Sequence, residues 1–192
     1  VSMILRGRFE PAKKLLDGAI AIAELHGLKA EANLLRHGHA LRLFHGGEMQ
    51  RALKVIASLD PSATSEAHHA VCLGYLGRLD EAKRVLQSAR ELFGESADPR
   101  VESQIQITEA YLLLLEGKKD QARAILDRLV PFCEAHGLRL VRIHALEGLA
   151  LLESEQSIRE PLVKNFLMLR ERFGYPLLPG DRLRLAAILP VA

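Results

Sequence analysis

The sequence contains no tryptophan, and aromatic residues make up only 5% of its 192 residues. Binding of single-stranded nucleic acid relies on aromatic side chains that stack on bases, so this scarcity argues against it. The sequence also lacks an excess of one sign of charge, because it has 26 lysines and arginines and 24 aspartates and glutamates, which gives a net charge of +2. The two signs are interleaved along the chain, and their fields largely cancel within about 8 Å. We therefore expect no nucleic-acid partner for this segment.

Cysteine is equally scarce, with only Cys72 and Cys133. Two thiols cannot form the disulfide framework of a small secreted domain, so we expect reduced thiols and a cytoplasmic location. We interpret both as small apolar core residues rather than catalytic nucleophiles. Uncharged apolar runs such as Tyr111 to Leu115 are about five residues long, whereas a bilayer span needs about 20. The sequence therefore predicts no membrane partner.

The motifs that mark common enzyme classes are missing as well. There is no glycine-rich phosphate loop, nucleophile elbow or zinc-protease motif. Eight histidines invite a metal hypothesis, but the pairs 37/39 and 68/69 have spacings that point the two imidazoles apart on a helix. We expect histidines at the surface or at helix ends, no metal, no cofactor and no enzymatic activity.

What the sequence does contain is a repeat. A glycine is followed five residues later by an alanine, and a large apolar residue follows after four more, at four places: Gly7/Ala12/Leu16, Gly47/Ala52/Ile56, Gly77/Ala82/Leu86 and Gly117/Ala122/Leu126. The glycines are 40, 30 and 40 residues apart. A second alanine stands seven residues before the last three glycines and recurs once more, at positions Ala40, Ala70, Ala110 and Ala150. Such self-similarity is typical of repeat architectures.

The spacing has a physical interpretation. Each glycine stands where a helix ends in a tight turn that often needs a positive φ, and apolar residues recur at intervals of three and four on both sides. The alanines let two helices approach closely. The pattern predicts helical hairpins that bury their apolar faces by stacking. We expect helices over roughly 9–26, 28–45, 48–59, 63–76, 79–93, 99–116, 119–136, 138–154 and 158–173, and a short one over 181–188. Ser62 is the expected N-cap of its helix, Pro161 falls in a first turn, and Asp181 caps the last helix.

This order of small residue, glycine, alanine and large apolar residue resembles the tetratricopeptide repeat (TPR), although the family's usual large aromatic is replaced by Arg36, Glu66, Gln106 and Leu146. The resemblance implies an all-α fold, a right-handed superhelical array of antiparallel helix hairpins (a TPR-like α-solenoid). It covers residues 1–175 as about four hairpins after a leading half repeat, and leaves 176–192 as a C-terminal extension with a short terminal helix. Units near 40 residues, with helices ending in Glu-x-His-Gly, resemble the sensor region of large LuxR-type transcription regulators, including the maltose regulator.

In TPR arrays the first helix of each hairpin lines a concave groove where partners bind. Carried across, the resemblance implies a groove formed by Leu34, His37, Leu41, Phe44, Thr64, Val71, Tyr75, Gln104, Ile107, Tyr111, His144 and Glu147. This surface is apolar and aromatic, which favours docking of an apolar helix or extended segment. An alternative stays open: residues such as Leu41, Ile107 and Leu114 are simply core between repeats.

The leading hypothesis is a non-catalytic helical-repeat scaffold that binds a protein or peptide partner in its concave groove. The alternative is a small-molecule-sensing or regulatory domain excised from a LuxR-type ATP-dependent transcription regulator. Self-association through the ends of the array, at Val1–Leu5 and Leu183–Leu189, is a third hypothesis, because an array exposes apolar faces at its ends.

Overall fold

The computed structural model describes residues 2–189, and this part of the chain contains helices and no strand. Its helices are α1 (Ser2–Leu5), α2 (Phe9–Leu25), α3 (Lys29–His45), α4 (Met49–Ile56), α5 (Ala63–Tyr75), α6 (Leu79–Phe93), α7 (Pro99–Leu115), α8 (Lys119–Ala135), α9 (Arg139–Leu152), α10 (Gln156–Phe173) and α11 (Pro179–Leu185). The all-α prediction is confirmed.

Each helix expected from the pattern occurs at its predicted place, with ends that differ by a few residues. Ser62 caps α5 as expected, because its side chain accepts a hydrogen bond from the backbone of Ser65 at 3.1 Å. Two details of the prediction are wrong. Pro161 lies inside α10 rather than in its first turn, because α10 already begins at Gln156. Asp181 is the third residue of α11 and not its cap, and its carboxylate accepts from the backbone N–H of Leu178 at 3.1 Å.

The repeated glycines adopt the left-handed conformation that the tight turns require. The φ angles of Gly7, Gly47, Gly77 and Gly117 lie between +73° and +83°. The residue after each glycine donates its N–H to a carbonyl five residues upstream, as from Arg78 to Leu73 at 2.9 Å. This is a common way to close a helix, and it turns the chain back into the second helix of each hairpin.

The repeated alanines lie where helices meet. Ala40, Ala70, Ala110 and Ala150 are all 0% exposed. In the middle of the stack, a first helix packs on its own second helix and on the first helix of the next hairpin: α5 contacts α6 and α7, and α7 contacts α8 and α9. Three successive clusters of buried apolar side chains form the core along this stack. The helices therefore pack sequentially with their neighbours.

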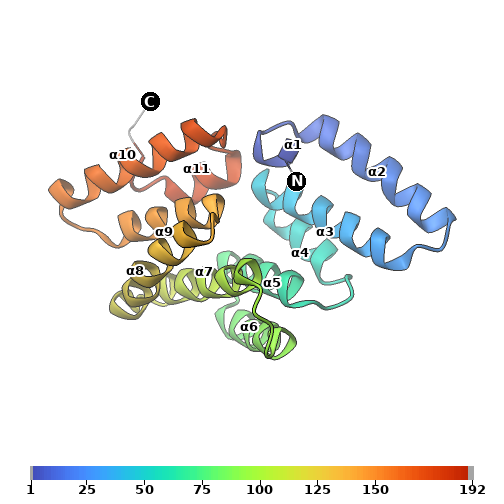
Figure 1. Ribbon diagram of the computed structural model, residues 1–192, viewed down its shortest axis with the longest axis horizontal. Coiled ribbons are helices and arrows are strands. Elements are labelled where there is room, and N and C mark those ends of the chain that lie inside the picture. Colours follow the sequence, from blue (N-terminus) through green and yellow to red (C-terminus); the bar gives the residue numbers. More distant parts are fainter. Residues whose placement is uncertain (1, 190–192) are drawn as a thin grey trace.

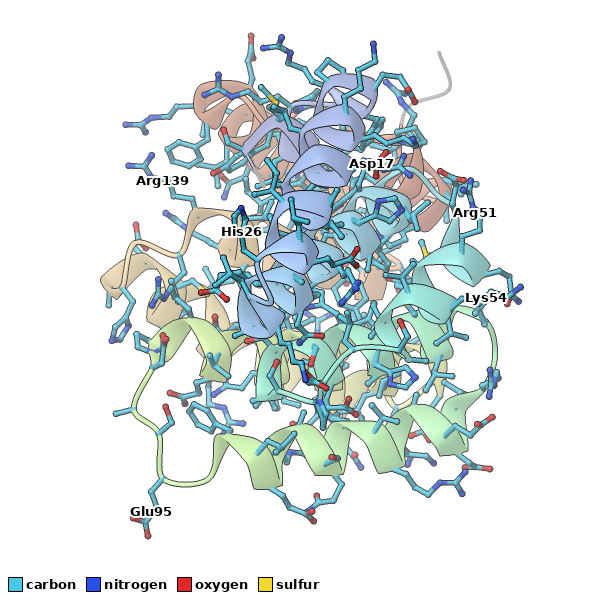
Figure 2. The ribbon with its side chains drawn as sticks, turned by 90° about the vertical axis from the view of Figure 1, so that its right-hand side faces the viewer. Asp17, His26, Arg51, Lys54, Glu95 and Arg139 are labelled. Carbon is cyan, nitrogen blue, oxygen red and sulfur yellow. The ribbon has the colours of Figure 1, made fainter. Side chains whose placement is uncertain are left out.

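The stack is curved, and α11 lies beside the N-terminal helices. Figure 1 shows the helices passing from α2 on one side, through α5 to α7 at the bottom, to α10 on the other side, with α11 placed between α10 and α1. Accordingly, α11 contacts α3. On the outside, Figure 2 shows the charged side chains of Arg51, Lys54, Glu95 and Arg139 pointing away from the molecule.

The two ends of the array differ in exposure. Ile4 and Leu185 are buried, whereas Leu183 is 67% exposed, and Val1 lies outside the described residues. The outer side of α2 and the start of α3 carry the exposed apolar side chains Leu15, Ile22, Leu25 and Leu34. Within residues 2–189, no helix has the length and apolarity that crossing a bilayer would require.

Candidate functional site

The first helices of the hairpins, α3, α5, α7 and α9, together form one face of the stack, which we call the first-helix face. A partly enclosed cavity of about 110 Å³ lies on this face, and we call it the central cavity. α1 and α11 complete its walls. The lining residues are Leu5, Leu41, Phe44, His45, His68, Val71, Tyr75, Gln104, Ile107, Thr108, Tyr111, Leu140, Val141, His144 and Arg184.

The structure brings eight of the twelve expected groove residues to this cavity: Leu41, Phe44, Val71, Tyr75, Gln104, Ile107, Tyr111 and His144. The other four lie elsewhere. Leu34 is 70% exposed. His37 packs on the ring of His68, Thr64 lines a neighbouring hollow, and Glu147 is fully buried in an ion cluster.

Aromatic side chains cross the first-helix face as a continuous row. The ring of Tyr75 lies 6.3 Å from the ring of Phe44 and 6.3 Å from that of Tyr111, measured between centroids. The hydroxyl of Tyr111 donates to the backbone carbonyl of His144 at 3.1 Å, and the guanidinium of Arg184 lies 5.8 Å from the Tyr111 ring centre. The row therefore links three successive hairpins to α11.

The C-terminal segment, residues 176–189, covers one end of this face. A Cβ atom at Gly180 would lie 2.7 Å from the carbonyl oxygen of Phe44 and 3.1 Å from that of His45. Backbone atoms cannot move aside as a flexible side chain can, so only glycine permits this approach. A Cβ atom at Gly47 would lie 3.2 Å from Cδ1 of Leu183. The helix α11 thus lies directly on the last turn of α3.

Four buried charges hold the C-terminal segment in place: Glu147 from α9, Arg170 from α10, and Asp181 and Arg184 from α11. Arg170 donates through Nε to Oε1 of Glu147 at 2.7 Å, and its Nη1 lies 3.0 Å from Oδ2 of Asp181. Arg184 is paired with Asp181, and its Nη1 lies 3.8 Å from Oε2 of Glu147. We call these four residues the ion cluster. Its formal charges cancel, as buried charges require.

Burial and the neighbouring arginines shift the pKa values of the two carboxyl groups in opposite directions. Burial raises the pKa of Glu147 in spite of Arg184 and Arg170 nearby. Burial would also raise the pKa of Asp181, but the same two arginines hold it well below its usual range. Asp181 is therefore the firmly ionised carboxylate, and it also accepts the backbone N–H of Leu178.

The expectation that the histidines lie at the surface or at helix ends is wrong for His68 and His144, which lie inside α5 and α9 and line the cavity. His45 is at a helix end as expected, because it is the last residue of α3, but it is only 8% exposed. Nε2 of His37 lies 3.3 Å from Nδ1 of His68. Burial lowers the pKa of His45 to about 4 and that of His68 to about 3, and it also lowers the pKa of His144. These imidazoles are neutral near pH 7. By contrast, His136 is exposed at the end of α8.

Sequence reasoning missed several cavity residues, namely Leu5, His45, His68, Thr108, Leu140, Val141 and Arg184. The residues on α5, α7 and α9 are neighbours of predicted positions on the same helix faces, so a wider stripe would have included them. No pattern in the sequence predicted that Arg184 lines the cavity. It comes from outside the repeats and reaches Tyr111 across a sequence separation of 73 residues.

A second, wider hollow adjoins the cavity. It has a volume of about 700 Å³ and is lined from the starts of α5, α7 and α9, including Thr64, Arg100 and Arg139. Gln104, Leu140 and Val141 line both hollows. The two hollows therefore meet at these three side chains.

Neither cysteine belongs to this site. Cys72 and Cys133 are buried, and burial raises their thiol pKa values to about 12 and about 11, so both are protonated near pH 7. Within the described part of the chain, no group of three or more metal-ligating side chains is close enough together to hold an ion. Comparison of the chain with family models, with curated proteins and with solved structures found no match.

Proposed function

We propose that this chain is a non-catalytic helical-repeat module that binds a small molecule in its central cavity and serves as the sensing part of a regulatory protein. One observation carries the proposal: four successive hairpins contribute their first helices to one partly enclosed hollow that is mostly apolar and has a few polar groups. Small-molecule sites typically combine these features. The resemblance to the long repeats of LuxR-type regulators supports the same function.

The proposal includes the handedness of the stack and the identity of its concave side. Alanine and glycine recur at equivalent places in each hairpin, and this repetition supports a right-handed, TPR-like superhelix with the first-helix face on its concave side. A ligand bound there would contact α3, α5, α7, α9 and α11 together. Binding would therefore tighten the stack and the C-terminal segment at the same time, which is how a ligand could be sensed at a distance.

The test is a thermal-shift screen of sugars, amino acids and small organic acids on the wild type and on the Val71→Phe variant. Val71 lines the cavity from α5 and is not a member of the ion cluster, so a phenyl ring there would fill the space. Ile22→Phe on the exposed side of α2 is the matched control. A compound that raises the Tm of the wild type and the control, but not of Val71→Phe, supports the proposal. Equal shifts in all three proteins, or no shift in any of them, contradict it.

A protein or peptide partner on the first-helix face is the second candidate. The observation in its favour is that this face already holds a short helix, α11, through Gly180, Leu183 and Arg184. A partner helix would have to compete with α11 for the same contacts. A synthetic peptide of residues 176–189 provides the probe. It should bind the Gly180→Ala variant, in which the attachment of α11 is weakened, more tightly than the wild type, and equal affinities would count against this candidate.

A further inference from the structure

The walls of the central cavity carry positive and neutral polar groups and no carboxylate. Among the lining residues, Arg184 is the permanent cation, and His45, His68 and His144 are the neutral imidazoles. Glu147 and Asp181 lie behind this wall, on the Nη atoms of Arg184. The remaining lining is apolar apart from Gln104, Thr108 and the two tyrosines. A ligand with an anionic end and an apolar body fits this distribution.

Three of the lining residues have a buried polar atom without a hydrogen-bond partner. These atoms are Nε of Arg184, Nδ1 of His45 and Nε2 of His144. The side chains of Arg184 and His45 are 5% and 8% exposed, so bulk solvent does not reach them freely. An unsatisfied buried polar group costs about 1–3 kcal/mol, and more when it is charged. Because Nε of a guanidinium always carries a proton, the missing partner of Arg184 is an acceptor.

The size of the cavity limits the ligand. An apolar cavity of about 150 Å³ admits benzene, and each liquid water takes up about 30 Å³. A cavity of about 110 Å³ therefore accommodates either a few waters or a molecule somewhat smaller than benzene. Acetate and propionate satisfy this limit, whereas butyrate already has as many non-hydrogen atoms as benzene.

Resting on the function proposed above, we propose that the central cavity binds a short-chain monocarboxylate. A carboxylate oxygen accepts the free N–H of Arg184, and the imidazoles of His45 and His144 donate from their free nitrogens. The alkyl chain packs against Leu41, Val71 and Ile107. Hydrogen bonds to a charged group are roughly twice as strong as neutral ones, so the acid is preferred over its neutral amide.

The experiment is calorimetric titration of the full chain with propionate and with propionamide, which have the same shape and differ in charge. We expect propionate to bind at least ten times more tightly than propionamide. Propionate affinity should be lost in Val71→Phe and kept in the Ile22→Phe control. Valerate should bind the wild type poorly, and its affinity should improve in Leu41→Ala, which enlarges the cavity.

Each other outcome overturns the proposal in an identifiable way. Propionamide binding as tightly as propionate would reject an anionic ligand and leave the small-molecule function standing. Propionate bound equally well by Val71→Phe would place the acid outside the cavity. Failure of acetate and propionate to bind at all would show that waters occupy the cavity. The small-molecule function proposed above is tested separately by the thermal-shift screen. That function is contradicted if no compound in the screen stabilises the wild type without also stabilising Val71→Phe.

Discussion

At the scale of single residues, the ion cluster is the feature whose disruption should lower the free energy of unfolding most. Glu147 is 0% exposed and faces two arginines, so its loss would leave Arg170 and Arg184 with Asp181 as their sole counter-ion in the cluster. Removing one partner of a buried pair typically destabilises a protein far more than removing one partner of a surface pair. A substitution that removes a single charge from the cluster should therefore destabilise the protein more than the same substitution at the surface.

We predict that Glu147→Gln lowers the free energy of unfolding by about 3 kcal/mol, because it leaves buried positive charge uncompensated. Glu153→Gln is the matched control: Glu153 pairs with Arg123 at 2.9 Å, but this pair is partly exposed. We expect the control to lose less than about 1 kcal/mol. Urea unfolding measures both values, and similar losses in the two variants would refute the role of the cluster.

The buried histidines predict a dependence of stability on pH. His45 and His68 have folded-state pKa values lowered to about 4 and about 3, whereas an unfolded histidine takes up a proton near pH 6.5. Below pH 6.5 the unfolded chain therefore binds more protons than the folded chain, and stability falls as the pH drops towards 4.

Each such histidine contributes a slope of up to about 1.4 kcal/mol per pH unit in this window. The charges facing His45 are Asp181, which opposes the lowering, and Arg184 and Arg170, which add to it. Urea unfolding at several pH values should show a shallower loss for His45→Phe than for the wild type. Parallel curves between pH 6.5 and 4.5 would show that His45 is not buried as a neutral group.

At the scale of elements, the hairpins could be predicted because their signals are local. The turn at Gly77, the cap at Ser62 and the apolar spacing around Ala70 each act within a few residues, and the structure follows them. The placement of α11 could not be predicted. It depends on contacts of Arg184 with Tyr111 and Glu147, which are far away in the sequence and have no repeated pattern.

The same reason explains the candidate site. The repeat register predicted which residues lie on the first-helix face, and most of the expected groove residues do meet at the cavity. The register did not predict that this face is covered, because the cover is α11, which lies outside the repeats. The sequence also gave no signal that His45 and His144 would be buried beside Arg184, since helix periodicity predicts a face and not the element that covers it.

A pair of glycine variants tests the seating of α11. In Gly180→Ala the new methyl group would collide with the carbonyl of Phe44, so α11 must shift. We expect faster hydrogen exchange of the amides in Pro179–Leu185 and a lower Tm. Gly18→Ala is the control, because Gly18 lies inside α2 with open space around it and should gain about 0.5–1 kcal/mol. Unchanged exchange in α11 of Gly180→Ala would contradict the observed contact.

At the scale of the whole molecule, the curved stack and its C-terminal segment act as one enclosure. The hairpins supply a wall, the ion cluster fixes α11 at its edge, and Arg184 reaches into the space between them. In a repeat array each hairpin is stabilised by its neighbours. The sensing function proposed above requires in addition that a small molecule can enter the cavity.

Xenon binding tests that requirement most directly, because xenon enters apolar cavities without needing a specific chemical group. Methyl NMR spectra of the wild type under xenon pressure should show shifts at Leu41, Val71, Ile107, Leu140 and Val141, which line the cavity. The exposed methyl groups of Leu15, Ile22 and Leu25 should stay unchanged. Shifts confined to these exposed groups, or no response at the cavity methyls, would contradict the central claim that the hairpins enclose a space for a ligand.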